Sequence, residues 1–212
     1  MADADRPGAE EWVKGNEGID EMRDAVQACR GCELWRDATQ AVFGDGDPAA
    51  PMMLVGEQPG DREDLAGEPF VGPAGRILDA AAELAGIDRD SLYVTNAVKH
   101  FRFEERGKRR IHKKPAVGHI DACRPWLEAE VRAVDPAVIV CLGATAARAV
   151  LGRSVGIAQA RGQEFTAWGR KVVVTTHPAA IVRIRESDER ALAVEELARD
   201  LAFARDAAAK SA

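Results

Sequence analysis

A histidine stands among basic side chains in residues 107–115, which read GKRRIHKKP. A neutral imidazole is a good nucleophile, and nearby positive charge disfavours its protonation and so lowers its pKa. The same positive charge attracts phosphate groups. His112 is therefore either a nucleophile that its surroundings keep neutral or a surface residue that contacts phosphate. Its basic neighbours are Lys108, Arg109, Arg110, Lys113 and Lys114.

Four cysteines form a second candidate site. Cys29 and Cys32 make a C-x-x-C pair, and Cys123 and Cys141 follow much later. Four thiolates are the ligand number of a tetrahedral zinc site or of a cubane iron–sulfur cluster, and the spacing does not choose between the metals. Two other interpretations stay open: the C-x-x-C pair is redox-active, or Cys141, inside the apolar run VIVCLG, is a core residue.

Other reactive side chains follow apolar runs of the sequence. Glu57 comes after MMLVG, Asn96 lies near the end of SLYVTNAV, and His177 follows VVVTT, while CLGAT ends a further run. In an open α/β sheet, the carboxyl ends of the strands form the ligand crevice. The sequence therefore predicts one crevice that contains Glu57, Asn96, His112 and His177.

Apolar runs alternate with helical periodicity along the chain. The predicted strands span 52–57, 91–98 and 135–143, with a hairpin over 163–176 that turns near Gly169. The predicted helices span 74–87, 117–134, 144–152 and 188–209. Residues 19–38 are predicted to form a helical segment that is interrupted at Gly31. Residues 58–73 and the basic segment are predicted to be loops. Pro125 is expected to disturb the helix that contains it.

Strands that alternate with helices indicate a parallel sheet covered by helices. The predicted fold class is α/β, a three-layer α/β/α sandwich with a short central, mainly parallel sheet. No internal repeat or linker divides the chain, so residues 19–212 are predicted to form a single domain. Residues 1–18 are predicted to be a flexible N-terminal extension.

The charge of the chain is unevenly distributed. The net charge is −6, yet residues 99–114 hold eight lysines and arginines against two glutamates. A basic segment on an acidic body favours a focused anion site, such as one for a phosphodiester backbone. A solvated, flexible loop is the alternative.

The overall composition is that of a globular protein, with 212 residues, 46% hydrophobic and 30% charged. We find no apolar run of about 18 residues that would span a membrane. The acidic, polar start MADADRPGAEEW differs from a secretory signal. A cytoplasmic location without a membrane partner is expected.

Three segments together resemble the uracil-DNA glycosylase superfamily. GEQPGDREDLAGEPFVGPAGRILD, YVTNAVKHF and THPAAIVR are similar to the motifs of its iron–sulfur, family-4 type, and the resemblance runs from Cys29 to the last helix. In ordinary family-4 members the first motif resembles GEAPG, whereas this chain has GEQPG. That change and the KRRIH insertion are typical of the UdgX subgroup, whose members excise uracil and stay covalently joined to DNA through the loop histidine.

The resemblance implies how uracil would be bound. Phe70 would stack on the flipped base, and the amide of Asn96 would donate to uracil O4 and accept from N3–H, a pattern that cytosine reverses. His177 would donate a hydrogen bond to uracil O2, where negative charge develops. Gln58 and Asp61 would also contact the base, although turn chemistry explains Asp61 equally well.

The resemblance also implies a cofactor and a DNA interface. The four cysteines would hold a 4Fe–4S cluster of structural importance. Uracil-containing DNA, with single strands favoured, would be the partner, free uracil the product, and the protein a monomer. The expected phosphate contacts come from Lys108, Arg109, Arg110, Lys113 and Arg183.

In the subgroup's chemistry, His112 would attack the sugar carbon C1′ and form a covalent adduct, which makes the enzyme single-turnover. Gln58 cannot act as a base, so Glu57 is the nearest candidate carboxylate. It would accept a hydrogen bond from the other imidazole nitrogen and stabilise the positive charge that develops there. One departure is Ala179, which replaces a serine of the family motif. Two alternatives stay open: a conventional family-4 enzyme that turns over, and a metal-containing DNA-binding module without catalysis.

Overall fold

A central six-stranded sheet organises the protein, for which a computed structural model describes residues 6–15 and 18–210. The strand order is β1-β3-β2-β6-β8-β7, and the four inner strands are parallel. The two edge strands are antiparallel to their neighbours. The strands are β1 (Asp45–Gly46), β2 (Met52–Gly56), β3 (Leu92–Asn96), β6 (Val138–Leu142), β7 (Glu164–Ala167) and β8 (Arg170–Thr175).

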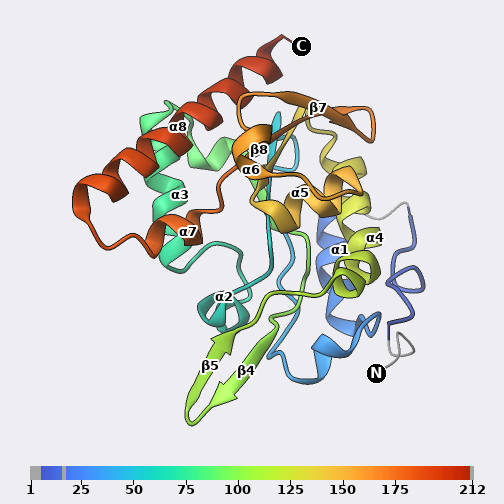
Figure 1. The fold of residues 1–212 in the computed structure, drawn as a ribbon. Coiled ribbons are helices and arrows are strands. Elements are labelled where there is room, and N and C mark those ends of the chain that lie inside the picture. The colour runs from blue at the N-terminus through green and yellow to red at the C-terminus, as the bar shows by residue number, and fades with distance from the viewer. Residues whose placement is uncertain (1–5, 16–17, 211–212) are drawn as a thin grey trace.

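Helices cover both faces of this sheet (Figure 1). One face carries α3 (Pro73–Leu84), α7 (Pro178–Val182) and α8 (Ser187–Ala209). The other face carries α1 (Ile19–Ala25), α4 (Val117–Val134), α5 (Ala144–Leu151) and α6 (Ile157–Ala160). The predicted three-layer α/β/α fold with a mainly parallel sheet is confirmed.

Two hydrophobic cores, one on each face, explain why the inner strands read as continuous apolar runs. Every residue of β2, β3 and β6 is buried. Along β2, Met53 and Val55 face one core, whereas Met52 and Leu54 face the other. A parallel sheet that is covered on both faces needs apolar side chains at every position of its strands, not only at alternate ones.

The segment 58–73, predicted as a loop, contains the short helix α2 (Asp61–Ala66). Glu63 accepts a hydrogen bond from the Gly60 backbone N–H at 3.1 Å and so caps the first turn. Gly67 ends the helix in the left-handed conformation, with φ of 82°. A helix of six residues is too short to produce a periodic pattern in the sequence.

The basic segment, also predicted as a loop, is an antiparallel hairpin of β4 (Phe103–Arg106) and β5 (Arg109–His112). Phe103 pairs with His112 at its base, and Gly107 makes the turn with φ of 61°. The hairpin projects away from the sheet (Figure 1). Its charged residues hide the alternation that would predict a strand, because both faces of the hairpin carry them.

Two further expectations met different outcomes. The segment 19–38 is interrupted as predicted: α1 is followed by the 3₁₀ turns Val26–Ala28 and Glu33–Arg36, which flank the CRGC sequence. Pro125, however, lies within a continuous α4. The carbonyl of Asp121 loses its helical partner there, and because Asp121 is exposed, water can satisfy it.

The predicted N-terminal extension falls partly outside the described residues, which omit 1–5 and 16–17. In the described part, Ala9 is buried in the core and the Gly8 N–H donates to the Gly31 carbonyl at 3.1 Å. Arg6 pairs with Glu33 at 2.7 Å. The boundary of the single domain at residue 19 stays a prediction. None of the described helices is long and apolar enough to cross a bilayer.

A fully buried ion pair joins the end of β3 to α4. The Lys99 ammonium pairs with the Glu130 carboxylate, and it also donates to the Thr95 hydroxyl at 2.7 Å and to the Asn96 carbonyl at 2.9 Å. Glu130 also accepts from the Tyr93 hydroxyl at 3.1 Å and from Thr95 at 2.9 Å. Buried charges persist when paired and hydrogen-bonded in this way.

Replacing Lys99 by methionine leaves the Glu130 carboxylate buried without its counter-ion. We expect the free energy of unfolding to fall by about 3–5 kcal/mol, as for other broken buried pairs. Chemical denaturation measures this change. Asp79→Asn, which breaks an exposed pair with Arg89, is the control and should have little effect. An equally small effect of Lys99→Met would contradict the importance of the buried pair.

Candidate active site

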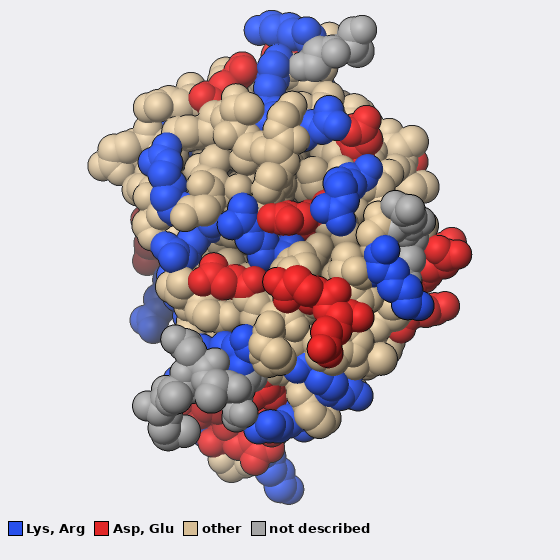
Figure 2. Space-filling view, turned by 90° about the vertical axis from the view of Figure 1, so that its right-hand side faces the viewer, with Lys and Arg blue, Asp and Glu red and all other residues tan. Residues whose placement is uncertain are grey.

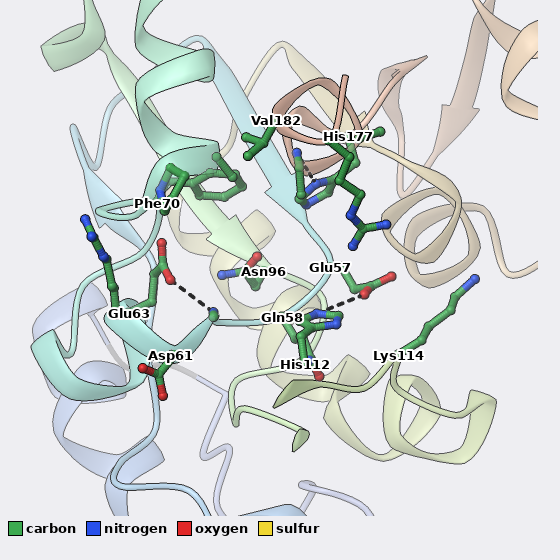
Figure 3. Close-up of a pocket in the computed structure, with 17 residues that line it drawn as sticks. Glu57, Gln58, Asp61, Glu63, Phe70, Asn96, His112, Lys114, His177 and Val182 are labelled. Carbon is green, nitrogen blue, oxygen red and sulfur yellow. Dashed lines mark hydrogen bonds and ion pairs between the residues drawn. The ribbon is translucent and has the colours of Figure 1, made fainter. Parts of the chain in front are cut away.

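A cavity of about 640 Å³ opens at the carboxyl edge of the sheet. Glu57 follows β2, Asn96 ends β3, and His177 follows β8, so parallel pairing brings these distant residues to the same edge. His112 reaches the cavity from the end of β5. The structure thus places the four residues of the predicted crevice around one cavity: Glu57, Asn96, His112 and His177 (Figure 3).

Phe70 forms one wall of the cavity. Its ring lies 6.2 Å from the ring of His177 with an interplanar angle of 28°. Its backbone is left-handed, with φ of 58°, a conformation that costs energy for a bulky residue and is found at functional sites. Gly56 makes room for this wall, because a Cβ there would stand 2.6 Å from the Phe70 ring and 2.3 Å from the Asn96 oxygen.

The Asn96 side chain lies at the centre of the cavity (Figure 3). It is only 3% exposed, and its backbone carbonyl is held by Lys99. Among the described residues, no group hydrogen-bonds its side-chain amide. Both the donor and the acceptor of that amide are therefore available to a planar ligand that enters the cavity.

His177 is held as a neutral hydrogen-bond donor. Its Nδ1 accepts a hydrogen bond from the Ala179 backbone N–H at 3.1 Å, so the ring proton must be on Nε2. Burial, with smaller contributions from His112 and Arg183 and against the opposing effect of Glu57, lowers the pKa of His177 to about 4. At neutral pH the side chain thus presents an uncharged Nε2–H.

His112 and Glu57 face each other across the cavity mouth. His112 Nε2 lies 3.4 Å from Glu57 Oε1, and the second carboxylate oxygen accepts a hydrogen bond from the Thr145 hydroxyl. Burial lowers the pKa of His112, Arg183 lowers it further, and Glu57 opposes the change. The predicted direction is confirmed, but the cause is burial with Arg183 and not the basic residues of the hairpin.

Arg110 clamps the hairpin to α2. Its guanidinium lies 2.6 Å from Asp61 and 2.5 Å from the fully buried Asp64, and it also covers the ring of Phe103 at 5.1 Å. Any phosphate contact by Arg110 would have to replace these bonds. Asp61 lines the cavity, as expected of a base contact, but its carboxylate is bound to Arg110.

Gln58 connects the GEQPG loop to the base of the hairpin. Its amide N–H donates to the carbonyls of Arg102 at 3.1 Å and Lys113 at 3.3 Å, and its oxygen accepts from the Arg102 N–H at 3.2 Å. Gln58 lines the cavity, but its amide is committed to the hairpin. Gln58 thus binds the residues that flank the hairpin, and the neighbouring Glu57 contacts His112 of KRRIH at 3.4 Å.

The other basic residues of the hairpin are spread over its surface. Lys108 and Arg109 are exposed at its tip, and Lys113 pairs with Glu104 at 3.0 Å. Arg183 and Lys114 line the cavity. Figure 2 shows a face on which basic and acidic side chains are interspersed, including at the bottom, where the hairpin projects. Basic side chains thus lie beside the cavity and at the hairpin tip, with acidic side chains between them.

Three of the four cysteines, Cys29, Cys32 and Cys123, lie within electrostatic range of one another. Burial raises the pKa of Cys32 to about 11 and also raises that of Cys123, and in both cases nearby cysteines add to the effect. Cys29 accepts a hydrogen bond from the Trp126 ring and Cys123 from the Lys99 backbone N–H, both at 3.3 Å.

Cys141 stands apart from these three in the middle of the sheet. Burial alone raises its pKa, without a contribution from another cysteine. In the part of the chain that the structure describes, no three His, Cys, Asp or Glu side chains lie close enough together to hold a metal ion. The described structure thus brings Cys29, Cys32 and Cys123 into one region and leaves Cys141 apart, without assembling the predicted four-cysteine ligand set.

Sequence reasoning missed two residues of this site. Thr145 follows β6 in the segment CLGAT, so the strand-end rule indicated the segment but not the residue. Glu63 is a buried residue that lines the cavity and accepts hydrogen bonds from the backbone N–H groups of Gly60 and Gly72 at 3.1 and 2.7 Å. The spacing of Gly60 and Glu63 is that of a helix cap, which was the available signal.

Residues 43–202 match the uracil DNA glycosylase superfamily. The chain belongs to the uracil-DNA glycosylase superfamily. All residues placed around the cavity fall within the matched range, whereas Cys29 and Cys32 precede it.

Curated relatives of this superfamily member include several type-4 uracil-DNA glycosylases. The protein of Thermotoga maritima is 33% identical over 86% of this chain and 92% of its own length. That of Archaeoglobus fulgidus is 34% identical over 82% and 89%, and that of Sulfurisphaera tokodaii is 33% identical over 77% and 76%. The similarity thus extends over most of each protein.

The clamp formed by Arg110 can be tested without DNA. Arg110→Gln removes the bonds to Asp61 and Asp64, so we expect backbone amides of residues 103–112 to exchange hydrogen roughly tenfold faster. Hydrogen-exchange mass spectrometry measures this rate. Lys108→Gln, at the hairpin tip, is the matched control and should leave it unchanged. Unaltered exchange in Arg110→Gln would show that the clamp does not hold the hairpin.

Proposed function

We propose that this protein is a uracil-DNA glycosylase whose His112 captures the sugar after uracil departs. The observation that carries the proposal is the placement of His112, 3.4 Å from the Glu57 carboxylate, at the mouth of a cavity that contains Asn96 and His177. The proposed nucleophile His112 and the carboxylate of Glu57 thus lie at the same cavity as two hydrogen-bonding groups. These are the amide of Asn96, which would recognise the base edge, and the uncharged donor of His177. This set matches the steps that base excision followed by covalent capture requires.

The cavity suits a uracil base that has left the DNA stack. Phe70 offers a flat apolar face, and the free Asn96 amide offers a donor to O4 and an acceptor to N3–H. Cytosine presents an amino group and an unprotonated ring nitrogen at these positions. Its amino donor would face the amide donor of Asn96, and its ring nitrogen would face the amide oxygen, so neither hydrogen bond would form. A base in single-stranded DNA needs no unpairing, which favours such strands as substrate.

Departure of the base creates negative charge on uracil. The C1′–N1 bond breaks, its electron pair goes to the uracil ring, and the sugar becomes an oxocarbenium-like cation. The Nε2–H of His177 is positioned to stabilise the charge at uracil O2, as oxyanion-hole donors do. Because its pKa is about 4, His177 remains this neutral donor throughout the physiological pH range.

Capture of the sugar cation requires that the imidazole of His112 is neutral. Its lowered pKa keeps the ring neutral, so the lone pair of one ring nitrogen can form the N–C1′ bond. The other nitrogen retains its proton, and the positive charge that the ring acquires is stabilised by the Glu57 carboxylate. The product is one uracil and one protein–DNA adduct, so each molecule would act once.

The cysteine group supports a proposed 4Fe–4S cluster on Cys29, Cys32 and Cys123. When bound, such a cluster would tie the N-terminal segment to α4. The predicted fourth ligand is Cys141, which has no cysteine neighbour. His100 is a second candidate, because it is buried and follows Lys99, whose backbone N–H binds Cys123.

A denaturing gel tests the proposed capture. Wild-type protein mixed with a single-stranded oligonucleotide that contains one uracil should give a slow band that survives boiling in SDS. His112→Ala should lose this band, because it lacks the nucleophile, while it continues to release uracil and leaves alkali-sensitive abasic DNA.

The controls separate the alternatives. An oligonucleotide with thymine in place of uracil should give no band. Abasic product without a band from the wild type would indicate a conventional enzyme that turns over. Binding that is independent of uracil and disappears at high salt, with neither product, would indicate a DNA-binding module and contradict the proposal.

Metal content tests the ligand set. We expect Cys123→Ala to lose most of its iron and its visible absorbance, because a central ligand is removed. His100→Ala and Cys141→Ala, purified side by side, identify the fourth ligand as the one whose loss lowers the iron per chain. A colourless wild-type protein that contains zinc would contradict an iron–sulfur cluster.

A further inference from the structure

Glu57 is held from two sides. One carboxylate oxygen faces His112 at 3.4 Å, and the other accepts a hydrogen bond from the hydroxyl of Thr145. Thr145 is 3% exposed, whereas the Glu57 side chain is 20% exposed. The contact to His112 is longer than an ordinary hydrogen bond, so the bond to the buried Thr145 is the firmer of the two restraints.

The backbone around Thr145 is fixed independently of Glu57. Gly143 precedes α5 with φ of 88°, and its N–H donates to the Thr175 carbonyl at the end of β8 at 2.9 Å. Thr145 therefore lies in the first turn of α5, where the positive end of the helix dipole favours a nearby carboxylate. Its hydroxyl is thus presented to Glu57 by a rigid element.

The groups that face His112 make the orientation of Glu57 important. The titratable or charged groups that act on His112 are Glu57, which follows β2, Arg183 at the end of α7, and His177 beside them. Of these, only Glu57 is negative. If its carboxylate turned away, the positive charge that His112 acquires on capture would face Arg183 without compensation.

We propose that Thr145 is a positioning residue for covalent capture: its hydroxyl holds the Glu57 carboxylate toward His112. The inference rests on the proposed function, since it concerns how His112 is supported in that reaction. It assigns Thr145 no part in base excision, because Asn96 and His177, the proposed uracil-binding residues, line the cavity and Thr145 does not. Loss of the hydroxyl should therefore slow capture more than excision.

The experiment compares Thr145→Val with Thr145→Ser. Valine keeps the shape without the hydroxyl, whereas serine retains the hydroxyl and should behave as the wild type. With a uracil-containing oligonucleotide, we expect Thr145→Val to form the adduct roughly ten- to a hundredfold more slowly, the effect of one hydrogen bond to a charged group. The strands that lose uracil without being captured should appear as alkali-sensitive abasic DNA.

The pH profile gives a second readout. Attraction to Glu57 raises the pKa of His112, so a displaced Glu57 lets it fall. The rate of adduct formation declines as pH drops through this pKa, because a protonated imidazole has no lone pair to attack. In Thr145→Val the decline should therefore begin at lower pH than in the wild type and in Thr145→Ser.

The outcomes distinguish the two proposals. If the wild type forms no adduct, the proposed function itself fails. If the wild type forms adduct and Thr145→Val shows the same ratio of adduct to abasic DNA and the same pH profile, Thr145 does not position Glu57. Equal losses of excision and capture, with unchanged profile, would indicate a general structural defect and would also overturn the inference.

Discussion

Parallel pairing of four strands is the constraint on which the site depends. Because β2, β3, β6 and β8 run in the same direction, the segments that follow them all emerge at one edge of the sheet. Each of these strands ends near the cavity or its supporting residues, and each contributes at least one polar side chain there. Burial on both faces holds these strands in the core, so the core fixes where each segment leaves the sheet.

The hairpin is a part of the site that the sheet does not position directly. It is attached by polar bonds instead: Gln58 binds the backbone on both sides of its base, and Arg110 binds two carboxylates of the α2 segment. These bonds also link the loop after β2 to the hairpin structurally, because a side chain of the loop binds the backbone of the hairpin base. A glutamine in that loop and a basic hairpin form a single structural unit.

Sequence reasoning found the sheet, the long helices and the convergence of Glu57, Asn96, His112 and His177, because buried strands and amphipathic helices produce strong local patterns. It missed α2 and the hairpin, since short elements with charged residues lack those patterns. The roles of Arg110 and Gln58 depend on partners distant in sequence. The Lys99–Glu130 pair was hidden because nothing in a sequence marks a lysine as fully buried.

The way in which the hairpin is attached has a consequence for how such proteins diversify. The bonds that attach the hairpin, from Gln58 and Arg110, lie at its base or along β5. Residues 107–109 at the tip do not line the cavity. The tip can therefore vary in length and composition while the geometry at His112 is retained. A change of the whole hairpin would, in contrast, also involve its partners Gln58, Asp61 and Asp64 outside the sheet.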